Sequence, residues 1–337
     1  MDIEFHYYLT HVIAKKSGFT KKEADTIAYA SQYVDDNDII FRINKGKKGD
    51  YWNFISQTMN ILKPKHELMR IYPIFHFVPG NPAADSACRR DGKQHVLNTT
   101  PGNEHAEYLL DFAFSAPEEI RLHQIGIATH VYADTWAHQN FVGWYDEFNG
   151  MGKVLPNIGH ADAEHNPDYP AHWWKDRRLL PELSHINNIN RCMDAGKKLF
   201  NKYQSYLDKE GRSNGELDWS GLEPELLKAI GKIKSNGEGK KSRIKKYKKL
   251  AETPDYDPYR WFNKAVQVKV RGLPDSKSGF AKDHLTFFRD RYEWKNKTAY
   301  QDTDWYRFQQ AVKRHEREGI KILNPVFGRM GIDLAEK

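Results

Sequence analysis

The spacing of apolar positions along the chain predicts a protein built mainly from helices. Apolar residues recur every three to four positions through residues 5–16, and the pair Ser17–Gly18 ends this pattern. Thr20 and Glu23 then match a capping box, in which each residue satisfies a free backbone N–H of the other. This match predicts a second helix that runs through about Val34.

The same periodicity predicts more helices, at about 51–62, 103–115, 118–140, 184–209, 222–233, 240–251 and 303–320. We expect loops at the acidic residues 35–38 and in the Gly-, Pro- and Asn-rich stretches 82–102 and 145–172. The best strand candidate is AVQVKV at residues 265–270. The pattern therefore predicts a mainly α fold.

One predicted helix carries an unusual polar stripe. In HVYADTWAHQNF, residues 130–141, His130, Asp134 and His138 stand four residues apart, so on a helix they fall within an arc of roughly 80°. A solvated polar face or hydrogen-bonded core histidines are the ordinary interpretations of such residues. Two imidazoles and a carboxylate on one stripe behind an apolar stretch favour a metal site, and zinc commonly takes these ligands.

Composition limits the kind of site and the number of domains. The two cysteines, Cys88 and Cys192, are too few for a disulfide framework or a Cys-rich zinc site, so His, Asp and Glu must hold any metal. The 337 residues suffice for one large domain or two ordinary ones. We expect a core over residues 1–190 and a mainly helical, basic region over 191–337, either packed on that core or independent.

Charge and hydropathy bear on partners and location. The net charge is +7, and Lys228–Lys249 holds ten Lys or Arg against one acid, Glu238. This segment is either a solvated basic stretch or a surface that attracts nucleic acid or an anionic membrane. No segment is apolar enough to span a bilayer, and the first residues do not form a secretory signal. We expect a cytoplasmic protein, or one exported by a route without a classical signal peptide.

Further ligand-type residues precede about residue 170. His160 and Glu164 repeat the four-residue spacing in NIGHADAEHNPDYP, and we expect both to bind one ion. One zinc needs three or four ligands, so the full set is enough for two or three ions. That set is His6, Asp35 or Asp36, His76, His130, Asp134, His138, His160 and Glu164.

The order of these residues resembles that of zinc-dependent phospholipase C and the related fungal 3′-nucleotidase/nucleases. In those enzymes a terminal amine with a nearby His is followed by an Asp, a His, a His-x3-Asp pair, a further His and a closing pair. The resemblance covers about residues 1–165 and includes HQNF at 138–141. Here three residues separate Asp134 from His138, whereas five are usual in those enzymes.

The resemblance implies a helical domain with three zinc ions in a cleft and a ligand set for each. One zinc would take Asp35, His76, His130 and Asp134; a second His138, His160 and Glu164; a third Met1 and His6, with Asp134 bridging. The implied activity is phosphodiester hydrolysis by a zinc-bridging hydroxide. Asp35 is preferred to Asp36, as a ligand that also orients or deprotonates the attacking water.

Other classes of protein fit less well. An HD-type phosphohydrolase needs a His followed by Asp, which the chain lacks, and a zincin needs His-Glu-x2-His, which neither His66–Glu67 nor His315–Glu316 completes. A non-catalytic protein that binds polyanions through Lys228–Lys249 is the alternative from another class. For an enzyme, HQNF favours a phospholipid substrate, whereas the net charge favours single-stranded nucleic acid.

Overall fold

Helices make up most of the chain in the computed structural model, which confirms the predicted mainly α class. The structure describes residues 1–58, 60, 65–152, 157–212, 218–235, 237–269 and 291–336. The α-helices are α1 (Thr10–Ser17), α2 (Lys21–Asp36), α3 (Lys65–Met69), α4 (Tyr72–Phe75), α5 (Glu104–Phe114), α6 (Glu118–Ala137), α7 (Asn188–Lys209), α8 (Trp219–Ile230), α9 (Lys240–Ala251), α10 (Arg260–Ala265) and α12 (Asp304–Gly328). A π-helical segment, η1 (Glu4–Leu9), precedes α1, and short 3-10 turns are η2 (Asp85–Ala87), η3 (Glu147–Asn149), η4 (Ala161–Ala163) and η5 (Tyr300–Asp302).

The first two helices follow the local signals in the sequence. The predicted helix over residues 5–16 is the continuous pair η1 and α1, which ends at Gly18 with a left-handed φ of 118°. The capping box of Thr20 and Glu23 opens α2 as predicted. However, α2 continues to Asp36, so Asp35 lies in the last turn of a helix and not in a loop.

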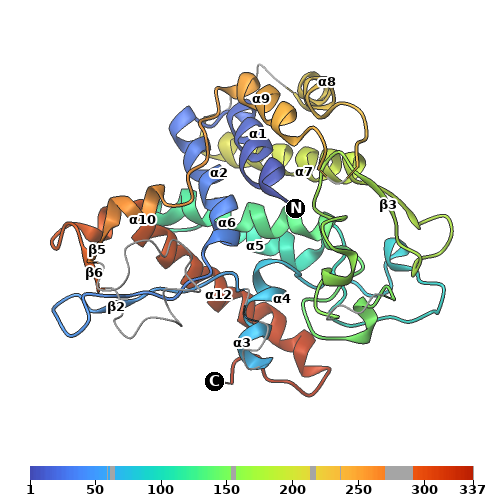
Figure 1. Ribbon diagram of the computed structural model, residues 1–337, viewed down its shortest axis with the longest axis horizontal. Helices are drawn as coiled ribbons and strands as arrows, with labels where there is room; N and C mark the ends of the chain where they lie inside the picture. Colours follow the sequence, from blue (N-terminus) through green and yellow to red (C-terminus); the bar gives the residue numbers. More distant parts are fainter. Residues whose placement is uncertain are drawn as a thin grey trace.

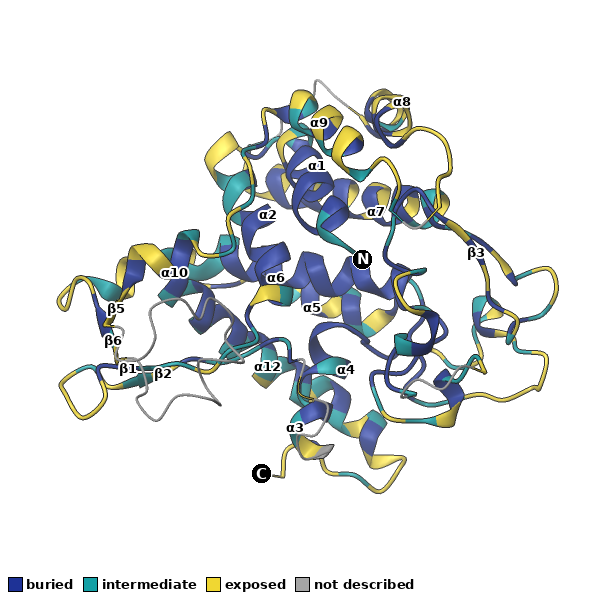
Figure 2. Cartoon of the chain, in the orientation of Figure 1, coloured by how far each residue is buried: buried dark blue, intermediate teal, exposed yellow. Residues whose placement is uncertain are grey.

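Helix α6 is the centre of the fold. It packs against α2, α5, α7 and α12, and every residue from His123 to Ala137 is buried (Figures 1 and 2). The helix ends at Ala137, earlier than the predicted residue 140, and His138 is its C-cap. A helix buried on all sides has no solvated face, so its polar stripe must find partners inside the protein.

A small sheet at one side of the helical body replaces the predicted helix at 51–62 (Figure 1). Its order is β2 (Tyr51–Trp52), β1 (Arg42–Ile43), β6 (Arg291–Trp294) and β5 (Val266–Lys269); β1 and β6 are parallel and the other pairs antiparallel. Residues 53–58 form no helix, and Met59 and residues 61–64 lie outside the described residues. The helix prediction was wrong because antiparallel pairing of Ile43 with Tyr51 and of Arg42 with Trp52 brings residues 51–52 into the sheet, and the periodicity within one segment does not detect pairing with another.

The remaining strands adjust two other predictions. Within the predicted strand at 265–270, Val266–Lys269 forms β5, Ala265 ends α10, and Val270 lies outside the described residues. Helix α7 begins at Asn188 because β4 (His185–Asn187) pairs with β3 (Trp173–Lys175).

The two halves of the chain share one apolar core. The main buried cluster includes residues from Met1 to Leu334, because α7 packs against α1 and α6 while α12 packs against α5 and α6. The C-terminal range 191–337 therefore packs on the range 1–190 in its described parts. None of the described helices is long and apolar enough to cross a membrane.

The close approach of α2 to α6 depends on Gly126. A Cβ at this position would lie 2.4 Å from the Ile27 carbonyl oxygen and 2.5 Å from the Ala30 Cβ. We expect Gly126→Ala to lower the free energy of unfolding by about 1–3 kcal/mol, because the two helices must separate. Urea unfolding measures this loss. Gly328→Ala is the matched control, since no atom lies within 4 Å of the Cβ it adds; equal stability of both variants would contradict the expectation.

Candidate metal centre

The polar stripe of α6 provides the central groups of a buried cluster. The side chains of His130 and Asp134 are 0% and 1% exposed, and His130 Nε2 lies 3.1 Å from Asp134 Oδ2. His138, at the C-cap of α6, lies on the same side, with Nδ1 3.5 Å from Asp134 Oδ2. Four further parts of the chain bring ligand-type residues to this stripe, and together with it they form three groups, named sites 1, 2 and 3 below.

Site 1 consists of Asp35, His76 and His130, from α2, the end of α4 and α6. Asp35 Oδ1 lies 3.8 Å from His76 Nδ1 and 3.7 Å from His130 Nε2, and these two nitrogens are 3.1 Å apart. Asp134 Oδ2 completes the group, 3.3 Å from His76 Nδ1. Asp36 turns away, since its carboxylate accepts a hydrogen bond from the Tyr256 hydroxyl at 2.6 Å.

Site 3 consists of His6, His130 and Asp134, together with the amine of Met1. The amine donates a hydrogen bond to Asp134 Oδ1, and His6 Nε2 lies 3.1 Å from the same oxygen. Asp134 therefore turns one oxygen toward site 3 and the other toward site 1. Both ring nitrogens of His6 are buried and make no hydrogen bond within the described residues.

Site 2 consists of His138, His160 and Asp168. Asp168 Oδ1 lies 3.7 Å from His138 Nε2 and 3.5 Å from His160 Nε2. The same oxygen is 3.8 Å from the Met1 amine, so site 2 adjoins site 3.

Asp168, and not the predicted Glu164, completes site 2. Glu164 is exposed, with a φ of 55°, and belongs to none of the three groups. The four-residue spacing from His160 brings ligands together only on an α-helix, but residues 161–163 form a single 3-10 turn. Gly159 and Pro167 were the available signals against a helix here, and Asp168 is the next carboxylate after Glu164.

Four histidines of the cluster share one hydrogen-bonding arrangement: each donates one ring N–H to a backbone carbonyl, which can only accept. The bonds run from His130 Nδ1 to Ser31 (2.9 Å), from His138 Nδ1 to His76 (2.7 Å), from His76 Nε2 to Ser56 (3.0 Å) and from His160 Nδ1 to Glu164 (2.8 Å). In a neutral ring the second nitrogen then carries a lone pair. In all four rings that second nitrogen faces a carboxylate of the cluster, as metal-binding histidines do.

Burial and neighbouring charges shift the ionisation of the cluster. Burial raises the pKa of the Asp134 carboxyl, but His138 and the Met1 ammonium outweigh it and hold this pKa well below its usual range. Burial lowers the pKa of the Met1 amine, whereas Asp134 and Asp168 raise it, to about 10. Burial also lowers the pKa of His138 to about 4. The ionised carboxylates of Asp134 and Asp168, whose pKa values are both held well below the usual range, form an environment that attracts cations.

The cluster meets solvent at Asp35 and His160. Their side chains are 30% and 20% exposed, whereas those of His6, His76, His130, Asp134 and His138 are at most 5% exposed. The ring of Phe77 stacks on His138 with centroids 4.3 Å apart and packs beside His160. Asp35 and His160 are therefore the members of sites 1 and 2 that solvent reaches most readily.

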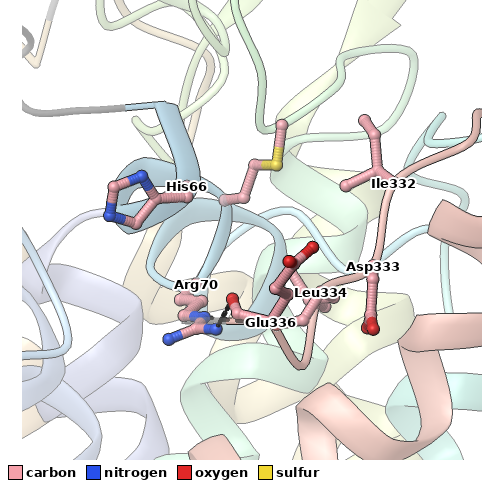
Figure 3. A pocket seen from close by; sticks show the side chains of 7 residues that line it. His66, Arg70, Ile332, Asp333, Leu334 and Glu336 are labelled. Carbon is pink, nitrogen blue, oxygen red and sulfur yellow. Dashed lines mark hydrogen bonds between the residues drawn. The ribbon is translucent and has the colours of Figure 1, made fainter.

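Other notable histidines lie outside these groups. His123, on the same stripe of α6, pairs with Asp304 at 3.1 Å, and His11 bonds to Thr253 at 2.9 Å. A separate pocket lies between α3 and the last described residues, where Arg70 donates a hydrogen bond to the Leu334 carbonyl at 3.2 Å (Figure 3). No residue of sites 1 to 3 lines that pocket.

Comparisons with known proteins describe the family but no activity. No curated protein and no solved structure matches the chain significantly. Residues 1–323 match the model of DUF6765, which is described as a family of unknown function, and the chain therefore belongs to this family.

Proposed function

We propose that the protein is a zinc-dependent phosphodiester hydrolase of the phospholipase C type, with two to three zinc ions held at sites 1, 2 and 3. The observation that carries this proposal is the arrangement of the histidines. His76, His130, His138 and His160 each have one ring nitrogen bound to a backbone carbonyl and the other facing a carboxylate. Outer-shell hydrogen bonds of this kind orient histidines for metal binding.

The residues present fit zinc. Site 1 offers Asp35, His76, His130 and Asp134, which are nitrogen and oxygen donors without sulfur, as in catalytic zinc sites. Site 2 would hold a second ion through His138, His160 and Asp168. Site 3 would hold a third through the Met1 amine, His6 and Asp134. His6 supports site 3 most directly, because its ring is fully buried, its Nε2 lies 3.1 Å from Asp134 Oδ1, and its Nδ1 has no hydrogen-bond partner among the described residues.

Residues of the chain would both hold the zinc ions and position the attacking water. Bound zinc would activate a water molecule and neutralise charge on the phosphoryl oxygens. Asp35 is the carboxylate at the solvent side of the cluster, so it can orient the attacking water and accept its proton. Asp134 is fully buried, with one oxygen toward site 1 and the other toward site 3, which suits a bridging ligand.

A substrate panel tests the proposal. Purified chain loaded with zinc is assayed on a chromogenic phosphodiester, phosphatidylcholine, single-stranded DNA and RNA, with chelated protein as the control. We expect zinc-dependent hydrolysis of the chromogenic diester and of phosphatidylcholine. Hydrolysis of DNA or RNA alone would favour the nuclease alternative. A chain that binds no zinc and hydrolyses none of the four would contradict the proposal and favour a non-catalytic binding protein.

The α6 stripe should control metal content as well as activity. We expect His130→Ala, Asp134→Ala and His138→Ala each to reduce bound zinc and to lower diester hydrolysis by at least about 100-fold. Asp134→Ala should lose the most zinc, because Asp134 faces two sites. His123→Ala is the control from the same helix face, since His123 pairs with Asp304 outside the cluster. Metal analysis and turnover measure the effects, and unchanged zinc content in all three variants would contradict the metal assignment.

We also propose that the protein binds a polyanion, through exposed lysines of the segment Lys228–Lys249. Lys245, Lys246 and Lys249 on α9 are exposed. We expect their combined change to Gln to weaken binding to nucleic acid or anionic vesicles at low salt, with a smaller difference at high salt. Turnover of the small chromogenic diester should persist. Binding curves at two salt concentrations measure the effect; identical curves for variant and wild type would remove this surface from the proposal.

A further inference from the structure

Two cations of the basic segment turn inward, toward the first residues of the chain. Helix α9 packs against η1 and α1 (Figure 1). Arg243 donates two hydrogen bonds of 2.7 Å to the carboxylate of Glu4, and the two side chains are 5% and 0% exposed. Lys240 lies one turn earlier, with Nζ 2.8 Å from Asp2 Oδ2. Both cations are therefore paired with acids at the start of the chain, Arg243 in the interior and Lys240 with partial exposure.

The linker before α9 contacts the segment that follows Asp168. The backbone N–H of Lys234 donates to the Ala171 carbonyl at 2.7 Å, and His172 donates to the Lys234 carbonyl at 3.2 Å. The backbone N–H of Asp2 in turn donates to the Asp168 carbonyl at 3.2 Å. The linker and α9 together therefore contact both the first residues of the chain and the segment that follows Asp168.

We propose that Lys240 and Arg243, together with the linker around Lys234, form a brace that positions the Met1 amine and Asp168 for sites 3 and 2. This inference rests on the proposed function. Chain ends fray unless they are tied down, and the two ion pairs tie residues 2 and 4 to α9. A buried, bidentate Arg–carboxylate pair fixes direction as well as distance, which an exposed lysine does not.

Site 1 does not depend on the brace. Its residues come from α2, the end of α4 and α6, which are joined through the apolar core. Loss of the brace should therefore affect sites 2 and 3 and spare site 1. A role in general stability would instead reduce metal binding at all three sites, so retention of about one zinc ion per chain in a folded variant distinguishes positioning from folding.

The experiment uses the full chain with Arg243→Gln, Lys240→Gln and Arg243→Lys, and Lys241→Gln as the matched control. Lys241 is exposed, on the same helix and next to Lys240. The first readout is acylation of the Met1 amine in chelated protein, measured by mass spectrometry of the N-terminal peptide. The second is zinc bound per chain after reloading, and circular dichroism checks folding.

We expect the Met1 amine to be acylated at least about tenfold faster in Arg243→Gln than in wild type. The buried Glu4 carboxylate loses its partner in this variant, so residues 1–4 detach from α9. Lys240→Gln should show a smaller increase, since its pair is partly exposed. In Arg243→Lys the Met1 amine should be acylated more slowly than in Arg243→Gln, because lysine keeps the positive charge but cannot form the bidentate pair of hydrogen bonds that arginine forms. The total zinc bound by Arg243→Gln should fall to about one ion per chain, as expected if only site 1 remains filled.

Acylation and zinc content equal to the Lys241→Gln control in both Arg243→Gln and Lys240→Gln would overturn the brace. If Arg243→Gln does not fold, the Lys240→Gln result decides. If wild-type chain binds no zinc, the proposed function fails, but faster Met1 acylation in the folded variants still supports the brace. Zinc binding in wild type with unchanged acylation in the variants overturns the brace and leaves the proposed function intact.

Discussion

The buried carboxylate of Asp134 is the group around which the centre of this protein is arranged. An ionised carboxylate loses the solvation of water when it is buried, and only opposite charges and hydrogen-bond donors offset that cost. Asp134 lies on a helix that the rest of the fold encloses, so its partners are His130 and His138 of the same stripe and groups from other elements. η1 provides His6, the chain end provides the Met1 amine, and the residue after α4 provides His76.

This requirement couples the packing of the helices to the chemistry of the cluster. Close contact between α2 and α6, which Gly126 permits, lets the Ser31 carbonyl accept a hydrogen bond from His130. That bond turns Nε2 of His130 toward Asp134 and Asp35. The proposed hydrolase activity depends on these side-chain directions, and not on the helical fold as such, which hosts many functions. The family match extends over residues 1–323, so it includes α9 and the residues of the brace as well as the cluster.

Local signals predicted the parts of the structure that local interactions determine. The capping box of Thr20 and Glu23 involves residues three apart, and α2 begins where it predicts. His130 and Asp134 are neighbours because one helix turn separates them, whatever packs around that helix. Pairing between separate segments was outside the reach of such signals. Residues 51–52 joined a sheet whose next strands come from residues 42–43 and 291–294, and the predicted helix at 51–62 was therefore wrong.

The sequence by itself determined the helix that carries the stripe and most of the side chains that meet in the cluster, with their order along the chain. The tertiary structure alone decided which carboxylate completes site 2, which of Asp35 and Asp36 faces the histidines, and where Lys240 and Arg243 point. The physical reason is that helical periodicity relates only residues within a few turns. Asp168 reaches His138 through an irregular segment, and Arg243 meets Glu4 across most of the chain, so both contacts depend on how distant elements pack.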